Sequence, residues 1–283
     1  MYKLFLAGAL GLLLGACSGQ GDAPPASSQG DAVTAASAPA ADNPEEITPP
    51  RSAAELSAEM LDKAIDSKAR TAEARAQDKV RHPRQVLTFF GLRPDMNVIE
   101  VDPADGWYAA ILAPLLRDNG TYTAAVTSTL DTKQADGATR QSLRALFDTH
   151  PDRYGRARLA AFDPHTPNLG TPGSADMVLS LRSLHVWVDE DRADTMLRAV
   201  YDVLAPGGVF GVVEKRAPDD AGSAASKEAA LRQKDVVAMA ERAGFHLDAQ
   251  SDVNAVPGDA DAGDDRMTLR FVKPSKPAHA ASR

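Results

Sequence analysis

Short apolar runs and longer amphipathic stretches alternate along most of this chain. The apolar runs, rich in Val, Ile, Leu and Ala, predict strands at residues 97–101, 121–126, 158–161, 176–181, 209–214, 247–251 and 267–273. Apolar residues spaced three or four apart predict helices at 107–116, about 138–149, 189–204 and 226–243. Strands that alternate with helices in this way are typical of an α/β fold, in which a mostly parallel sheet carries helices on both faces.

The last predicted strand differs from the others. Within residues 267–273, Met267, Leu269 and Phe271 alternate with more polar positions. This two-residue period indicates a strand with one face in the core, which is typical of antiparallel pairing. We therefore expect one antiparallel strand in the sheet.

The N-terminal part of the predicted domain is helical. The sequence SAAE at residues 52–55 has the form of a capping box, so we expect a helix from there to about Val80. Its apolar positions give way to alanines, which leaves a charged face. This indicates a solvated helix lying across the domain, with a partner-binding helix as the alternative. Pro83 begins a second, short helix that Gly91 ends.

The first residues of the chain have the pattern of a bacterial export signal. Lys3 precedes an apolar run at residues 4–14, which is too short to span a bilayer, and LGAC follows at residues 14–17. This stretch resembles the lipobox of bacterial lipoproteins, in which the cysteine, here Cys17, is lipidated and becomes the mature N-terminus. An ordinary cleaved signal is the alternative. Ser18 stands where an aspartate commonly marks inner-membrane retention, which favours the periplasmic face of the outer membrane.

The chain divides into a signal at 1–17, a linker at 18–50, one folded domain at 51–274 and a frayed tail at 275–283. The linker is rich in Ala, Pro, Ser, Gly and Asp, so we expect it to be a disordered tether. Cys17 is the only cysteine, so a lipid on it leaves no thiol for a disulfide, a thiolate metal site or a nucleophile. The net charge of −8 disfavours nucleic acid as a partner.

Residues 98–114, VIEVDPADGWYAAILAP, hold the strongest candidate for a ligand site. A strand rich in β-branched residues runs into an acid-and-glycine turn, and that turn opens onto an apolar helix. In an α/β sheet, a tight turn between a strand and a helix N-terminus is the usual place for an anionic or nucleotide-like ligand.

Several segments together resemble one family. RHP at 81–83, GWY at 106–108, LHVW at 184–187 and LAPGG at 204–208 occur in the same order in the class I S-adenosylmethionine methyltransferases of bacteria, specifically in a predicted group often carried as exported proteins. The resemblance covers most of residues 51–274. It implies a Rossmann-like, seven-stranded methyltransferase sheet with an antiparallel strand near one edge, and S-adenosylmethionine as the cofactor.

The resemblance places cofactor contacts in the turn. The family pattern Glu-x-Gly-x-Gly-x-Gly is matched by Glu100, the acid that orients the methionine and ribose parts of the cofactor, and by Gly106, the last glycine. Asp102 and Ala104 stand at the first two glycine positions. Ala104 adds a β-carbon, which costs roughly 1 kcal/mol or more if the position needs a positive φ. Asp102 either pairs with a cationic part of the cofactor or occludes the pocket.

Further cofactor contacts are implied at Trp107, Tyr108 and Arg182, and at Asp163, whose carboxylate would accept from the adenine amine. The alternative for Asp163 is a turn-forming role before the following proline. After the second strand the family carries an acid for the ribose hydroxyls, whereas this chain has VTST at 126–129. A hydroxyl is a weaker acceptor for a diol than a carboxylate is.

The segment after the fourth predicted strand carries the catalytic candidate. His185 lies there with Arg182, over the crevice where ligands bind in such sheets. A neutral imidazole can take a proton from a nucleophile near physiological pH, so His185 is the general-base candidate, and Arg182 can hold an acidic substrate. The alternative is that His185 and Trp187 are hydrogen-bonded packing residues.

Other enzyme classes lack their motifs. The chain has no Gly-x-Ser-x-Gly elbow, no phosphate-loop lysine motif, no His-Glu-x-x-His and no metal-like spacing of its histidines, so no metal site is predicted. One hypothesis is an S-adenosylmethionine-dependent methyltransferase of the bacterial cell envelope that acts on a small molecule or an envelope component. The other is a non-catalytic, methyltransferase-like lipoprotein that binds a small molecule or an envelope partner. The altered glycines, the absent ribose acid and the export signal favour the second, whereas the intact order of the family elements favours the first, which is preferred at the level of the family.

Overall fold

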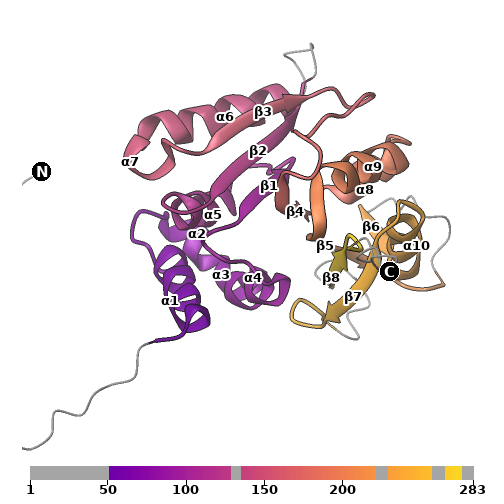
Figure 1. The fold of residues 1–283 in the computed structure, drawn as a ribbon, viewed down its shortest axis with the longest axis horizontal. Helices are drawn as coiled ribbons and strands as arrows, with labels where there is room; N and C mark the ends of the chain where they lie inside the picture. The colour runs from indigo at the N-terminus through magenta and orange to yellow at the C-terminus, as the bar shows by residue number, and fades with distance from the viewer. Residues whose placement is uncertain (1–50, 129–134, 221–228, 257–264, 276–283) are drawn as a thin grey trace, which may run out of the picture. The chain divides into compact units, whose positions relative to one another are not determined.

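A mixed sheet organises the part of the chain that the computed structural model describes, which is residues 51–128, 135–220, 229–256 and 265–275 (Figure 1). The export signal with Cys17, the linker at 18–50 and the tail from residue 276 onward lie outside the described residues. The predictions made for these segments are therefore not tested by the fold.

The described residues form eight strands. They are β1 (Asn97–Val101), β2 (Thr121–Thr127), β3 (Arg158–Phe162), β4 (Ala175–Leu181), β5 (Leu204–Ala217), β6 (Ala230–Arg232), β7 (His246–Ser251) and β8 (Arg266–Val272). Their order is β3-β2-β1-β4-β5-β8-β7, and the short β6 pairs in parallel with the end of β5. β8 is antiparallel to both β5 and β7, and the other neighbours are parallel. The predicted α/β fold, with an antiparallel strand near one edge, is confirmed, and β6 is an addition to it.

Helices cover both faces of this sheet (Figure 1). They are α1 (Ala53–Ile65), α2 (Ala72–Ala76), α3 (Asp78–Arg81), α4 (Pro83–Phe90), α5 (Ala109–Leu116), α6 (Ala135–Thr149), α7 (Pro151–Tyr154), α8 (Leu184–Asp189), α9 (Ala193–Val203) and α10 (Gln233–Arg242). Side chains of α1, α4, α5, α6 and α7 belong to one buried cluster, and those of α8, α9 and α10 belong to another.

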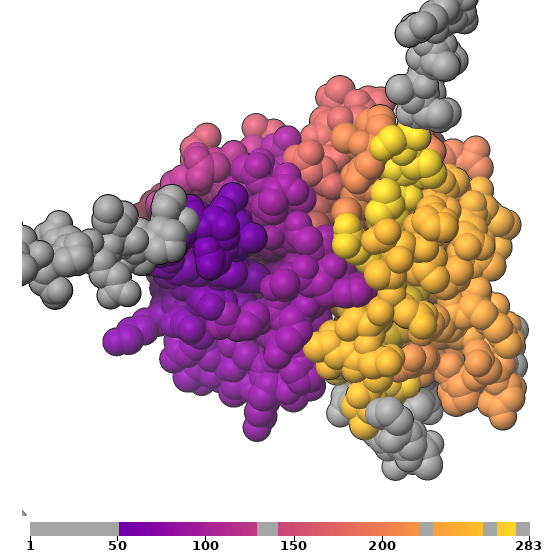
Figure 2. All heavy atoms as spheres, turned by 60° about the horizontal axis from the view of Figure 1, so that its bottom comes forward, coloured from indigo at the N-terminus to yellow at the C-terminus, as the bar shows by residue number. Residues whose placement is uncertain are grey.

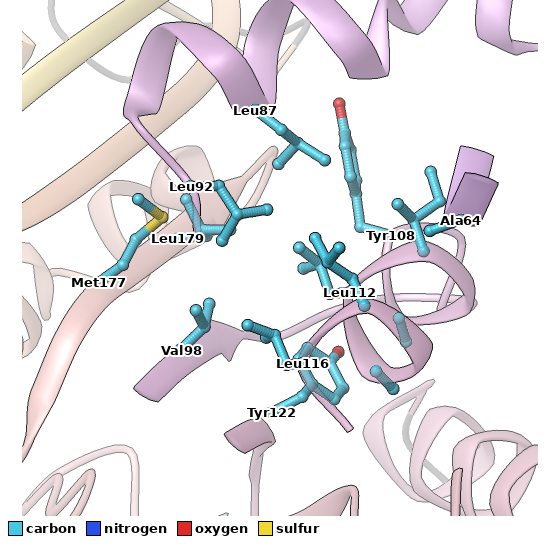
Figure 3. Close-up of a cluster of buried hydrophobic side chains, with 14 of the residues drawn as sticks. Ala64, Leu87, Leu92, Val98, Tyr108, Leu112, Leu116, Tyr122, Met177 and Leu179 are labelled. Atoms are coloured by element: carbon cyan, nitrogen blue, oxygen red, sulfur yellow. The ribbon is translucent and has the colours of Figure 1, made fainter. Parts of the chain in front are cut away.

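Successive strand residues supply these two cores. On β1, Val98 belongs to the first cluster and Ile99 to the second, as the two-residue period of a strand requires. Figure 3 shows part of the first cluster, in which side chains of α4, α5, β1 and β4 meet: Leu87, Leu112, Leu116, Val98, Met177 and Leu179. Because both faces are buried, the strands read as nearly continuous apolar runs. Every predicted strand is therefore found within one residue of its expected ends, except β5, which extends further on both sides.

Two helix boundaries are confirmed by their capping geometry. Ser52 Oγ accepts from the backbone amide of Glu55 (3.2 Å), and the Glu55 carboxylate accepts from the amide of Ser52 (2.7 Å), which completes the predicted capping box of α1. Pro83 occupies the first turn of α4, and Gly91 ends that helix with a φ of 77°.

The expected single helix at 52–80 is wrong beyond Ile65. Arg70 turns inward there, and its buried guanidinium donates to the Ile65 carbonyl (2.7 Å) and to both carboxylate oxygens of Asp78 (2.9 and 2.7 Å). The alanines of this segment provide no apolar stripe that a continuous helix could bury. The chain therefore folds into the short helices α2 and α3 around Arg70.

Three other helix predictions need correction. The helix expected at 189–204 is split into α8 and α9, and Asp191 between them has a φ of 52°. The helix expected at 226–243 begins at Gln233 because β6 precedes it, and residues 221–228 lie outside the description. The helix expected at 107–116 begins at Ala109, since the two residues before it belong to the turn. Within the described ranges, no helix is long and apolar enough to cross a membrane.

Candidate functional site

The turn between β1 and α5, residues 102–106 and named here the β1 turn, has a left-handed backbone at three alternate positions. φ is 49° at Asp102, 49° at Ala104 and 77° at Gly106. Such values are routine only for glycine, and a β-carbon costs about 1–2 kcal/mol at each position. Two residues with side chains thus hold the conformation that glycines adopt without strain. Strain of this kind persists only where the surrounding contacts maintain it.

The Asp102 side chain supplies such contacts. Its Oδ1 accepts from the amide (3.3 Å) and the hydroxyl (3.0 Å) of Thr127 at the end of β2, and its Oδ2 accepts from Nε1 of Trp187 on α8 (3.2 Å). Burial raises the pKa of Asp102, and these hydrogen bonds oppose the rise. Trp187 is fully buried, as the packing alternative requires. The carboxylate therefore ties the β1 turn to β2 and α8.

Glu100, at the end of β1, is a buried acid beside the turn. Tyr122 of β2 donates to its Oε2 at 2.7 Å. Burial raises the pKa of Glu100 to about 8, although the Tyr122 hydroxyl and the Arg81 guanidinium oppose the rise. The carboxyl group is therefore largely protonated near neutral pH, and it can then both donate and accept a hydrogen bond.

Trp107 and Tyr108 attach the β1 turn to the N-terminal helices. The guanidinium groups of Arg70 and Arg81 lie over the Trp107 ring, 4.9 and 4.7 Å from its centroid, and Trp107 Nε1 donates to the carbonyl of Ala74 (2.9 Å). Tyr108 packs edge-on against Trp107 with ring centroids 4.6 Å apart. Both aromatic side chains are buried, so the segment expected to be a solvated helix instead packs directly over the candidate site.

The same N-terminal helices meet the C-terminal strands. His82, which has a left-handed φ of 44°, donates from Nδ1 to Oδ1 of Asn254 (3.1 Å), and Asn254 donates to the hydroxyl of Thr268 on β8 (2.9 Å). Arg266 donates to the carbonyl of Val80 (3.3 Å). Figure 2 shows the purple part of the N-terminal half next to the yellow and orange C-terminal part of the domain. Residues far apart in sequence thus build one wall of the crevice.

His185 and Arg182 are brought together by a residue that the sequence analysis did not select. Glu214, fully buried on β5, accepts at Oε2 from Nδ1 of His185 (3.1 Å) and from its backbone amide (3.2 Å). Nε of Arg182 lies 3.8 Å from Oε1 of the same carboxylate. Because Glu214 holds the proton on Nδ1, the other ring nitrogen of neutral His185, Nε2, is the one able to accept a proton. An acid at the carboxyl end of a central strand was the signal available for Glu214.

Two cavities open at the carboxyl ends of β1, β2, β4 and β5. The larger crevice cavity, of about 450 Å³, is lined by Arg81, Glu100, Pro103, Ala104, Asp105, Trp107, Tyr108, Leu181, Arg182, Val213, Asn254 and Arg266. The smaller crevice cavity, of about 220 Å³, is lined by Asp102, Ala104, Val126, Thr127, Arg182, Ser183, His185, Val186, Glu190 and Arg192. Ala104 and Arg182 line both, so the cavities adjoin at these two residues. A hollow of about 610 Å³ between β5 and α10 contains none of the predicted site residues.

Most of the predicted site residues therefore gather in one place, but Gly106 and Asp163 line neither cavity. Glu100, Trp107, Tyr108 and Arg182 line the larger cavity, whereas Asp102 and His185 line the smaller one. Asp163 is exposed, lines neither cavity, and accepts from the amide of His165 (2.8 Å), which is the turn-forming geometry. A cofactor role for Asp163 stays a prediction. Among the residues that the structure describes, no group of three or more His, Cys, Asp and Glu side chains could hold a metal ion.

The fold is that of the Rossmann-like class I methyltransferases. A methyltransferase from Aquifex aeolicus, described as S-adenosylmethionine-dependent, superposes with a TM-score of 0.53 at 15% identity, over 76% of this chain and 98% of the other. The [4+2]-cyclase SpnF superposes with a TM-score of 0.51 at 18% identity, over 75% and 86% of the two chains. The carbon methyltransferase CurJ gives 0.51 at 14% identity, over 76% and 58%. A scan against family models and a search of curated proteins gave no match.

Proposed function

We propose that this chain is an S-adenosylmethionine-dependent methyltransferase of the bacterial cell envelope that acts on a small molecule or an envelope component. The observation that carries the proposal is the β1 turn. Its backbone is left-handed at all three positions where the family pattern has glycine, including the two that carry side chains. Maintaining that conformation against a strain of about 1–2 kcal/mol per residue is expected where a ligand needs the turn.

The residues around the turn fit the cofactor. The larger cavity, of about 450 Å³, lies within the range of small-molecule sites. The carboxylate of Asp102 lies against Thr127 and supplies an acceptor at the end of β2, where the sequence lacks the family's ribose acid. Glu100, Asp102 and Gly106 would hold the cofactor, with Trp107 and Tyr108 as walls of the larger cavity. Glu100 and Gly106 match the family pattern, whereas Asp102 stands at its first glycine position.

Bound S-adenosylmethionine supplies a methyl group, which passes to a substrate nucleophile while the sulfur keeps the electron pair of the broken bond. His185, which lines the smaller crevice cavity, would act as the general base for that nucleophile. Glu214 holds its Nδ1 proton, so Nε2 is the nitrogen left to take a proton. Orientation alone supplies much of the rate of such transfers, so the demand on this base is modest.

The alternative is a methyltransferase-like protein that binds a ligand without transferring a methyl group. Asp102 favours this alternative, because its carboxylate already accepts from two neighbouring side chains and occupies a position that a glycine would leave open. The same fold is used by the cyclase SpnF, so fold alone does not decide the reaction.

Titration with S-adenosylmethionine and S-adenosylhomocysteine separates the two functions. The full chain, purified in a non-ionic detergent, is expected to release or absorb heat with both ligands and to gain thermal stability, by about 2.7 kcal/mol at a ligand concentration of one hundred times Kd. Adenosine triphosphate, which shares only the adenosine, serves as the control and should bind at least tenfold more weakly. Absence of heat and of stabilisation at millimolar S-adenosylhomocysteine would leave only the non-catalytic alternative.

We also propose that a lipid on Cys17 holds the protein to the periplasmic face of the envelope, with the outer membrane favoured. The apolar run and the LGAC motif support this, and Cys17 is the only cysteine available. Cys17→Ser should leave the precursor uncleaved or release the protein from membranes, measured by fractionation and by the mass of the mature chain. Ser18→Ala is the matched control and should fractionate normally. Normal processing and an unchanged membrane fraction for Cys17→Ser would contradict lipidation.

A further inference from the structure

The larger crevice cavity is rich in arginine. Arg81 at the end of α3, Arg182 after β4 and Arg266 at the start of β8 reach it from three separate segments. The acids that line it are Glu100 and Asp105. Because burial raises the pKa of Glu100 to about 8, that carboxyl is largely protonated near neutral pH and does not cancel a guanidinium charge. The cavity is therefore positive, although the whole chain has a net charge of −8.

Arg81 is held in place without using its hydrogen-bond donors. Its guanidinium stacks on the buried Trp107 ring at 4.7 Å, and within the described ranges no acceptor or acid is joined to it by a hydrogen bond or an ion pair. A stacked guanidinium has lost much of its freedom already, so it binds an anion with a smaller loss of entropy. Its planar fork suits the two oxygens of a carboxylate or a phosphate.

Arg182 is the second available cation. Its side chain is 38% exposed, and its contact with Glu214 is long, at 3.8 Å. It lines both crevice cavities, so it stands between Arg81 on one side and His185 on the other. An anion held by Arg81 and Arg182 would therefore place the rest of its molecule beside the candidate general base.

We propose that the larger crevice cavity binds the anionic group, a carboxylate or a phosphate, of a small methyl acceptor through Arg81 and Arg182. That the bound molecule is a methyl acceptor rests on the proposed function. The charge balance favours the acceptor over the cofactor as the source of the anion, because S-adenosylmethionine carries a sulfonium cation of its own. An acceptor anion next to it offsets the positive charge of the arginines.

Benzoate, its neutral counterpart benzamide, and inorganic phosphate are the probes. In calorimetric titrations of the full chain in detergent, benzoate or phosphate should bind, with benzoate at least about tenfold tighter than benzamide. Arg81→Gln and Arg182→Gln should each lower the affinity for the anion by about tenfold or more. Arg93→Gln is the matched control, since Arg93 is 56% exposed and lies outside the cavity. Arg81→Gln also removes a contact with the Trp107 ring, which can affect folding. Arg182→Gln removes no such contact, so it tests the anion site separately.

The outcomes separate this inference from the proposed function. Benzoate that still binds in the presence of saturating S-adenosylhomocysteine supports a separate acceptor site. Full competition would overturn the inference, because the arginines would then serve the cofactor carboxylate. If neither benzoate nor phosphate binds, or if Arg81→Gln and Arg182→Gln behave like Arg93→Gln, the anion site is wrong. A failure of S-adenosylhomocysteine to bind would overturn methyl transfer alone, and the arginine variants would still decide whether an anion site exists.

Discussion

Gly106→Val is expected to abolish binding of S-adenosylhomocysteine and to lower the free energy of unfolding. Gly106 has a φ of 77°, and a β-carbon there would lie 2.7 Å from Cδ2 of Leu143. The left-handed backbone costs about 1–2 kcal/mol for a residue with a side chain, and overpacking adds about 1–3 kcal/mol. Either the Leu143 side chain or the turn must shift to relieve this contact, and a shift of the turn would distort the backbone that we propose contacts the ligand. Calorimetric titration and urea unfolding measure the two effects.

A matched glycine separates loss of binding from loss of stability. Gly173 has a similar φ of 73°, but a β-carbon there would meet nothing within 4 Å. Gly173→Val should therefore lower the free energy of unfolding only by the cost of the left-handed backbone, and it should bind S-adenosylhomocysteine like the parent chain. Asp102→Ala removes the hydrogen bonds to Thr127 and Trp187 but leaves Gly106 in place, so it should weaken binding without abolishing it. If Gly106→Val binds the ligand normally, the β1 turn is not the cofactor site.

Glu100→Gln is expected to make the protein markedly more stable at alkaline pH. Burial raises the pKa of Glu100 from 4.5 to about 8, so between these values the folded state keeps a proton that the unfolded chain releases. The free energy of unfolding then falls as pH rises, by about 1.4 kcal/mol per pH unit across that window, or on the order of 4 kcal/mol between pH 5 and pH 8. The glutamine side chain stays neutral, and its oxygen can still accept a hydrogen bond from Tyr122. The substitution therefore removes the fall in the free energy of unfolding that Glu100 causes as pH rises.

Urea unfolding at several pH values between 5 and 8 measures the effect. Asp102, whose pKa burial also raises, contributes in the same direction, so the variant should reduce the slope without removing it. Glu59→Gln is the control, because Glu59 is 61% exposed and should leave the slope unchanged. Equal slopes for Glu100→Gln and the parent chain would show that Glu100 titrates normally in the folded state.

The sheet was predictable from the sequence because its strands are buried on both faces. Val98 and Ile99 point into different cores, so β1 reads as a plain apolar run with sharp ends. The segment after Ile65 was not predictable in the same way. Its course depends on Arg70, which looks like a surface residue in sequence but is fully buried against Asp78 and the Trp107 ring. Residue type alone does not show that an arginine has buried partners.

Site residues were predictable where they lie at or just after the end of a strand. Those whose role depends on contacts between distant segments were not predictable from the sequence. Glu100 lies at the end of a strand, Asp102, Arg182 and His185 follow strands, and all four line the two crevice cavities. The hydrogen bonds of Asp102 with Thr127 and Trp187 join three segments that are distant in sequence. The role of this carboxylate in holding the segments together could therefore not be predicted from the sequence. Glu214 was overlooked because its partners become neighbours only when β4 and β5 pair.

The hydrogen bond between His82 and Asn254 joins residues 172 positions apart. During synthesis the N-terminal helices emerge first, but a domain generally folds as a unit. One wall of the larger crevice cavity, however, includes Asn254 and Arg266. A nascent chain that has not yet released β8 has no complete pocket, so ligand binding requires that β8 has been synthesised and folded. Truncation in the last strand removes a wall of the binding pocket along with an element of the fold.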